Sequence, residues 1–101
     1  MTAIVVLSTF GNPDQAAGVA RTLVGEGLAA CVNIVPAVRS IYRWKGELCD
    51  DAETLAVIKT TTERRDALVA RLVALHPYEL PEAIVLPVDG GHAPYLDWLA
   101  G

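Results

Sequence analysis

The segment HPYELPE, residues 76–82, gathers a histidine, a tyrosine and two carboxylates around two prolines. Imidazole is the commonest protein ligand for copper and zinc, so His76 is a candidate metal ligand. Helical spacing would place His76 and Glu79 on one face, but the two prolines exclude a helix there. The other interpretation is a histidine that ends a helix and hydrogen-bonds its last carbonyls. That structural interpretation is the more common one, and both stay open.

Two cysteines and an acidic run offer further ligand atoms. Cys31 follows apolar residues in a predicted strand, where a free cysteine usually packs as a small hydrophobe, although its thiolate would suit Cu(I). Cys49 lies within the acidic run of residues 47–53, whose oxygens would suit calcium or magnesium. A solvated strand face is favoured for this run, because it has no glycine-bearing calcium loop. The two cysteines form no CxxC pair, so a disulfide framework is not expected.

Composition and charge limit the class of protein. The 101 residues are 52% hydrophobic and 20% charged, which predicts one folded domain over residues 1–101. A net charge of −4 with 8 Lys and Arg argues against a nucleic-acid partner. No apolar run is long enough to span a bilayer, and the first residues lack the basic region of a signal peptide. We therefore expect a cytoplasmic protein without a membrane partner.

The first half of the chain predicts a strand, a helix and a long hairpin. Residues 3–7 are continuously apolar and β-branched, which is typical of a central strand buried on both faces. Asn12 is a helix N-cap, and Gly27 is placed to end that helix. Residues 28–60 have strand character, with a turn at Gly46 and a bulge or bend at Pro36.

The second half predicts a helix, a strand and a short final helix. The pair Thr60 and Glu63 spells a capping box, so the second helix should start near residues 60–62 and stop before Pro77. Residues 82–88 form the last strand, and Pro87 places it at an edge or a bulge. A short helix over residues 95–99 completes the chain.

The element order is therefore β-α-β-β-α-β, an α+β fold of the ferredoxin-like type with an antiparallel sheet. Hairpin arms of about 14 residues would be about 46 Å long, whereas a compact domain of this size is roughly 33 Å across. The overhang would leave Ile41, Tyr42 and Trp44 uncovered unless another subunit packs on them. This geometry predicts an obligate oligomer.

Several blocks of the sequence together resemble the CutA family, the divalent-cation tolerance proteins. The blocks are ACVN (30–33), SIYRWKGE (40–47), IKT (58–60), HPYELPE (76–82) and YLDWL (95–99). The resemblance covers essentially the whole chain. It implies a ferredoxin-like subunit, a homotrimer held by the long hairpins and similar to the PII signalling trimers, and a non-catalytic role in tolerance of copper and other divalent metals.

The resemblance also implies where ligands would lie. It keeps Cys31, His76 and Glu82 as candidate ligands for copper or another divalent metal ion, with no organic cofactor. It further implies an inter-subunit cleft lined by Trp44, Lys59, Tyr78, His76 and Glu82, with Glu79 beside them. Packing between aromatic and basic side chains is the alternative for that group.

Other functions of the same fold are weighed against this one. An RNA-recognition module needs a basic, aromatic third strand, but ELCDDAETLAVIK is acidic. A copper chaperone of this topology would carry CxxC in the first loop, and a phosphatase-like enzyme an arginine; STFGNPDQ has neither. The remaining alternative is a PII-like regulatory trimer that binds a small anionic metabolite in the cleft.

Overall fold

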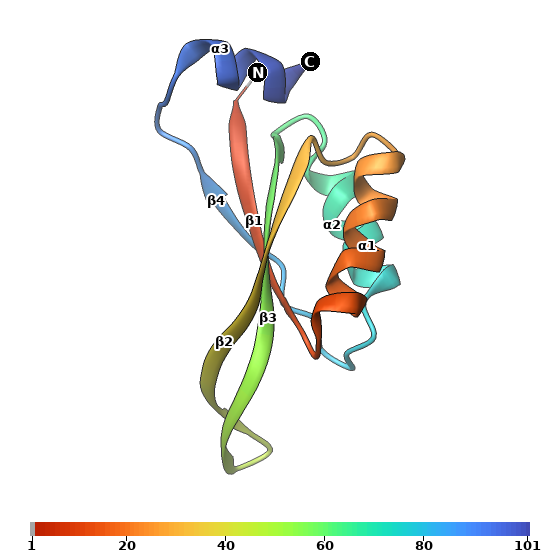
Figure 1. The fold of residues 1–101 in the computed structure, drawn as a ribbon, viewed down its shortest axis with the longest axis vertical. Helices are drawn as coiled ribbons and strands as arrows, with labels where there is room; N and C mark the ends of the chain where they lie inside the picture. The colour runs from red at the N-terminus through yellow and green to blue at the C-terminus, as the bar shows by residue number, and fades with distance from the viewer. Residues whose placement is uncertain (1) are drawn as a thin grey trace.

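The computed structural model describes residues 2–101, which form a four-stranded antiparallel sheet and three helices (Figure 1). The sheet order is β2-β3-β1-β4. This arrangement confirms the predicted ferredoxin-like α+β fold with a long central hairpin and a short C-terminal helix. The elements along the chain are β1 (Ala3–Phe10), α1 (Pro13–Gly25), β2 (Cys31–Trp44), β3 (Glu47–Thr61), α2 (Arg65–Leu75), β4 (Ile84–Pro87) and α3 (Ala93–Ala100).

The hydrophobic core lies between the sheet and helices α1 and α2, which cover one face of it (Figure 1). Alternate residues of β1 point into this core, so Ile4, Val6 and Phe10 are buried there against Leu23 of α1 and Leu72 of α2. We call this side the helix face and the opposite side the open face. The residues of β1 on the open face are only half-buried. The central position of β1 is thus confirmed, but its expected burial on both faces is wrong for the single chain.

The two helices of the core start in different ways. Asn12 caps α1 as predicted, because its Oδ1 accepts a hydrogen bond from the Gln15 N–H at 2.9 Å. The predicted capping box of the second helix is wrong: α2 starts at Arg65, and Thr60 lies in β3. The buried Thr60 hydroxyl donates to the Leu28 carbonyl at 2.6 Å. This contact with a distant part of the chain extends the strand past the position at which local sequence favours a helix.

The β2–β3 hairpin extends beyond the rest of the sheet. Its turn residues Lys45 and Gly46 both have positive φ, 49° and 81°, as a two-residue hairpin turn requires. Strand β1 pairs with β3 only as far as Thr54, so among residues 2–101 no further strand lies beside the outer part of the hairpin (Figure 1). The chain is 44 Å long in its largest dimension and has a radius of gyration of 14.0 Å. The predicted overhang is confirmed.

The remaining elements lie at the opposite end. Strand β4 pairs with β1 alone and is shorter than the predicted 82–88, and Pro87 ends it at the sheet edge. Helix α3 packs near the end of the sheet where both termini lie (Figure 1), and Lys59 Nζ approaches the Tyr95 hydroxyl there at 3.4 Å. None of the helices within residues 2–101 is long and apolar enough to cross a membrane.

Candidate functional site

His76 lies where α2 ends and the chain turns toward β4. Its Nε2 is 2.8 Å from the Thr9 carbonyl oxygen, and its Nδ1 accepts a hydrogen bond from the Tyr78 N–H at 3.1 Å. The acceptor role of Nδ1 implies that Nε2 carries the proton and donates to Thr9. The ring stacks on Phe10 with centroids 4.2 Å apart and is only 7% exposed. Both ring nitrogens are therefore engaged within the chain.

Burial lowers the pKa of His76 from its ordinary 6.5, while the Thr9 carbonyl and the Glu53 charge act in the opposite direction. The imidazole is consequently neutral near pH 7. Its contacts join the end of β1 to the start of the 76–82 segment. The position agrees with the structural interpretation, in which the histidine closes the end of the helix.

A bulge in β2 decides which side chains of the hairpin share a face. The register shifts between Val35 and Val38, at the predicted position of Pro36, and the Thr54 hydroxyl donates to the Pro36 carbonyl at 3.0 Å. Before the shift Val35 pairs with Leu55; after it Val38 pairs with Glu53. Because paired residues lie on the same face of a ribbon, the outer hairpin presents one mixed aromatic and acidic face. It carries Ser40, Tyr42, Trp44, Glu47, Cys49, Asp51 and Glu53.

Two tyrosines bind carboxylates on this face. The Tyr42 hydroxyl donates to Asp51 Oδ2 and the Tyr78 hydroxyl to Glu53 Oε2, both at 2.6 Å. The hydrogen bond to Asp51 raises the pKa of Tyr42 to about 12. Burial, and then the bond to Glu53, raises the pKa of Tyr78. Both phenols stay protonated at neutral pH and anchor the hairpin and the 76–82 segment through charge-assisted bonds.

A cleft of about 880 Å³ separates the outer hairpin from the 76–82 segment. The aromatic side chains Tyr42, Trp44 and Tyr78 contribute to its walls. Its charged lining residues are Glu53, Glu79 and Glu82, with no lysine or arginine among the residues that line it. The other lining residues are Thr9, Ser40, Ile41, Pro77 and Leu80.

The cleft has an excess of negative charge. Burial raises the pKa of Glu82, and the nearby Glu53 charge raises it further. At the rim, Lys45 Nζ lies 3.8 Å from Glu79 Oε2 and 5.5 Å from the centroid of the Trp44 ring. This lysine belongs to the hairpin turn. The inner carboxylates thus face the cleft without a basic lining residue beside them.

The predicted site residues divide into two groups. Trp44, Tyr78, Glu79 and Glu82 line the cleft together, and His76 supports the segment behind it. Cys31 and Lys59 pair with each other across β2 and β3 near the other end of the sheet, where Lys59 contacts Tyr95.

The single chain does not assemble the predicted metal ligands. Lys59 pairs with Val5 of β1, whereas His76 bonds to Thr9, four positions further along that strand. Cys31, beside Lys59, is therefore separated from His76 and Glu82. Within residues 2–101, no three His, Cys, Asp or Glu side chains lie close enough together to hold a metal ion. Ligation by Cys31, His76 and Glu82 stays a prediction that needs another subunit or a rearrangement.

Sequence reasoning missed Glu53 and Tyr42 as cleft residues. The sequence predicts a solvated acidic run around Glu53 and an uncovered Tyr42, whereas both residues line the cleft. The turn at Gly46 sets the pairing of the outer hairpin and could have placed Tyr42 and Glu53 on one face. The contact between Tyr78 and Glu53 joins distant segments, and no local pattern indicates it.

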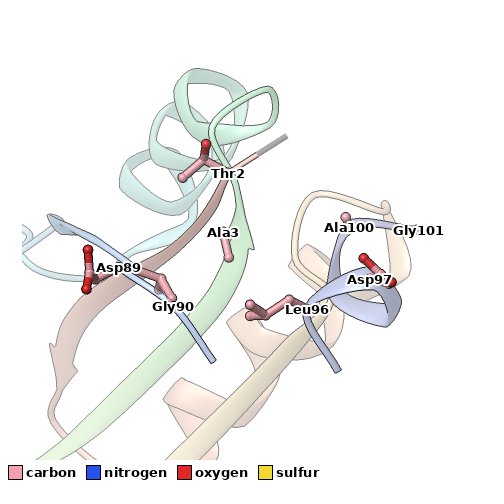
Figure 2. Close-up of a pocket in the computed structure, with 9 residues that line it drawn as sticks. Thr2, Ala3, Asp89, Gly90, Leu96, Asp97, Ala100 and Gly101 are labelled. Atoms are coloured by element: carbon pink, nitrogen blue, oxygen red, sulfur yellow. The ribbon is translucent and has the colours of Figure 1, made fainter. Parts of the chain in front are cut away.

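A second pocket, of about 610 Å³, lies near the two termini. Figure 2 shows Asp89 and Asp97 on opposite sides of it, with Leu96 between them. Small residues and backbone form much of the remaining wall, contributed by Thr2, Ala3, Val88, Gly90, Ala100 and Gly101. It holds none of the predicted site residues and offers two carboxylates, so the cleft beside the hairpin is the better candidate site.

Comparison with known sequences agrees with this geometry. A family model described as CutA1 divalent ion tolerance protein matches residues 4–101. The divalent-cation tolerance protein CutA of Thermus thermophilus is 52% identical over 95 residues, which cover 94% of this chain and 92% of that protein. A chloroplastic CutA 1 protein of Oryza sativa is 46% identical over 95% of this chain, but the match covers only 54% of its own length.

Solved structures show the same fold. The Cut A1 structure from Thermus thermophilus superposes with a TM-score of 0.92 at 50% identity, covering 97% of this chain and 95% of the other. CutA from Xylella fastidiosa gives a TM-score of 0.94 at 40% identity, covering 98% and 95%. Sequence blocks, topology and overall superposition thus coincide over nearly the whole chain. It belongs to the CutA1 family of divalent-ion tolerance proteins.

Proposed function

We propose that this chain acts as a homotrimer in the tolerance of copper and other divalent cations, in the cytoplasm, and catalyses no reaction itself. The similarity to divalent-cation tolerance proteins over nearly the whole chain supports the tolerance role. The composition of the open face supports the assembly. A small anionic metabolite in the cleft, as in a PII-like trimer, is less favoured because the lining carboxylates would repel it.

The proposed trimer rests on the apolar side chains of the open face. Val5 of β1 pairs with Leu86 of β4, and Leu7 pairs with both Val57 and Ile84, so these side chains form one apolar surface. Ile84 is 50% exposed and Leu86 42% exposed in the single chain. Contiguous apolar surface of this kind marks a protein interface, and the overhanging hairpin would add to it. Two further chains would bury both.

Sedimentation of the wild type and two matched variants tests the assembly. Leu86→Asp places a charge on the open face, whereas Val24→Asp places one on α1, at a residue with the same 42% exposure. We expect the wild type and Val24→Asp to sediment as trimers and Leu86→Asp to dissociate, because burying an unpaired carboxylate is unfavourable. A wild type that stays folded as a monomer at micromolar concentration would refute the trimer.

The proposed metal ligands are Cys31, His76 and Glu82, brought within reach of one another at subunit boundaries. Among them, Glu82 lines the cleft directly, while both ring nitrogens of His76 are engaged. Binding at His76 would therefore require its bond to Thr9 or Tyr78 to break. Substitution of Glu82 is therefore the most direct test of metal binding.

Copper titration of the intact protein tests this part. Glu82→Gln removes the charge with little change in shape, and Asp89→Asn does the same at the second pocket. We expect Glu82→Gln to weaken Cu(II) binding and Asp89→Asn to leave it unchanged. Cys31→Ser should weaken Cu(I) binding under reducing conditions. Equal affinities in wild type, Glu82→Gln and Cys31→Ser would exclude both residues as ligands.

A further inference from the structure

The outer hairpin keeps its pairing register despite two unfavourable local features. At the bulge, Pro36 and Ala37 together oppose the single residue Thr54 of β3. At the turn, Lys45 has a φ of 49°, a left-handed conformation that is unfavourable for a residue with a side chain. A regular antiparallel ladder needs neither feature. The observed register is therefore stabilised by contacts that such a ladder would lack.

The competing arrangement is a regular ladder in which the outer part of β2 is shifted by one residue along β3. It continues the pairing seen before the bulge, where Val35 lies opposite Leu55. In the shifted ladder Ile41, instead of Tyr42, would lie opposite Cys49. Because the side chains of a strand alternate, a shift of one residue moves every outer side chain of β2 to the other face.

The turn is compatible with this shift. A two-residue turn of the observed kind requires positive φ at both positions, here Lys45 and Gly46. The shifted ladder would close with a three-residue turn over residues 44–46, which needs a left-handed residue only at its last position. That position would be occupied by Gly46. Lys45 would then leave the left-handed region, so the turn alone does not favour the observed register.

A buried hydrogen bond favours the observed register. The Thr54 side chain is 1% exposed, and its hydroxyl donates to the Pro36 carbonyl at 3.0 Å. In a regular ladder, carbonyls lie in the plane of the sheet and point toward backbone N–H groups. Straightening β2 would therefore take the Pro36 carbonyl away from this side chain. The hydroxyl would be left buried without its acceptor, which is unfavourable.

The exposed contacts of the outer hairpin distinguish the two registers less strongly. The bond between Tyr42 and Asp51 would be lost in the shifted ladder, but Tyr42 is 40% exposed and water can replace this partner. Arg39 binds Asp50 through an exposed ion pair. After the shift Arg39 would lie opposite Asp51, another carboxylate. The buried bond of Thr54 is thus the contact that separates the two arrangements most clearly.

We propose that the outer hairpin has a second accessible register, shifted by one residue, and that the Thr54 hydroxyl holds it in the observed one. Thr54 is a positioning residue, because it acts on Tyr42 through the strand that carries this side chain. The shift exchanges the two faces of outer β2, so one buried hydrogen bond selects the surface that the hairpin presents. Every group involved belongs to one chain, so the proposal depends neither on metal tolerance nor on the number of subunits.

Cys49 allows each register to be trapped as a disulfide. With Cys31→Ser as background, Tyr42→Cys places a thiol opposite Cys49 in the observed register, whereas Ile41→Cys does so only in the shifted one. Directly paired residues can be bridged, but side chains on opposite faces of a ribbon point apart. Oxidised glutathione serves as the oxidant. Non-reducing electrophoresis and peptide mapping separate a bridge within one chain from a bridge between chains.

The rate of bridge formation reports how often each register is visited. With Thr54 in place, the Ile41→Cys bridge should form at least about tenfold more slowly than the Tyr42→Cys bridge. Thr54→Val keeps the shape and removes the hydroxyl, so it should speed the Ile41→Cys bridge about 5- to 100-fold, the range for one buried hydrogen bond. Thr54→Ser keeps a hydroxyl and should leave the rate near that of the parent. An unchanged rate in Thr54→Val would overturn the proposal.

Thr60→Val is the matched control for loss of stability. The Thr60 hydroxyl is equally buried and donates to the Leu28 carbonyl at 2.6 Å, before the start of β2 and far from the bulge. Its removal should destabilise the fold and leave the rate of the Ile41→Cys bridge unchanged. An equal acceleration by Thr60→Val and Thr54→Val would show general loosening of the sheet and refute a specific role of Thr54.

Lys45 provides a test with the opposite sign. Lys45→Asn creates an Asn-Gly pair, the sequence that most favours a two-residue turn with positive φ at both positions. In the Thr54→Val background it should slow the Ile41→Cys bridge several-fold, an effect opposite to that of general destabilisation. A rate that stays the same or rises would show that the trapped form does not contain the three-residue turn, and the shifted register would be wrong.

Discussion

The two faces of the sheet differ in how much of their apolar surface a single chain buries. On the helix face, Ile4, Val6 and Ile58 are almost fully buried beneath α1 and α2. On the open face, Ile84 and Leu86 of the same sheet remain substantially exposed. Both faces are apolar, so composition alone does not separate them. The difference shows that one chain completes one core and leaves a second apolar face exposed, and the proposed trimer rests on that face.

The largest expected loss of stability follows from a substitution on the helix face. Leu72 of α2 is fully buried, so Leu72→Ala should lower the free energy of unfolding by about 2–5 kcal/mol. Its neighbour Val73 is 44% exposed, and Val73→Ala should cost much less. Urea unfolding at one protein concentration measures both. Similar losses from the two substitutions would break the contrast between packed and exposed apolar positions.

His76 links the helix face to the cleft and should matter through hydrogen bonds. His76→Gln should lower the free energy of unfolding at pH 8 by about 1–3 kcal/mol, because Thr9 and Tyr78 lose a buried partner. The folded-state pKa lies below 6.5, so the unfolded chain takes up this proton first as the pH falls. Stability should be highest above pH 6.5 and decline below it.

Urea unfolding of wild type and His76→Gln between pH 5 and 8 isolates this histidine. The difference between the two proteins should shrink as the pH falls through 6.5 toward the folded-state pKa. Other groups, including Glu82 with its raised pKa, contribute to both proteins and largely cancel. A difference independent of pH would show that His76 titrates alike in folded and unfolded chains.

One defect within the helix face should allow a gain in stability. Ser8 is fully buried, and its hydroxyl has no hydrogen-bond partner among residues 2–101. Ser8→Ala should therefore raise the free energy of unfolding by up to about 1 kcal/mol. Thr60→Val is the matched control, because that equally buried hydroxyl bonds to Leu28 and its loss should destabilise. Thermal unfolding that moves both variants in one direction would contradict this account.

The smallest effect concerns the outer surface of the helices. Arg71 of α2 donates to both oxygens of Glu26 at 3.0 and 2.8 Å, and the bond lowers the pKa of Glu26. The pair is solvent-exposed, so Arg71→Met should reduce stability less than any loss above. The reduction should disappear in high salt, which screens such pairs. A loss that persists at 1 M salt would indicate packing by the arginine stem instead.

The sequence predicted most features that depend on neighbouring residues. The Asn12 cap, the Gly46 turn and the Pro36 bulge follow from local backbone preferences, and the structure has all three. The predicted start of α2 was wrong because the Thr60 hydroxyl bonds to the Leu28 carbonyl, 32 positions away. The hydrogen bond between His76 and the Thr9 carbonyl could not be predicted from local sequence either, since Thr9 lies 67 positions away along the chain. Contacts between distant segments, rather than local patterns, decide the shape of the cleft.

The bulge at Pro36 determines which side chains of the outer hairpin share a face with the carboxylates. Its single extra residue shifts the alternation of β2, so that Tyr42 and Trp44 share a face with Glu53. If the strand lost the bulge but kept all of its residues, Ala37 would pair with Glu53, and Ile41 and Arg43 would share a face with the carboxylates instead. Loss of one codon within the bulge would therefore keep Tyr42 and Trp44 beside Glu53, whereas a substitution that straightened the strand would put Arg43 on that face.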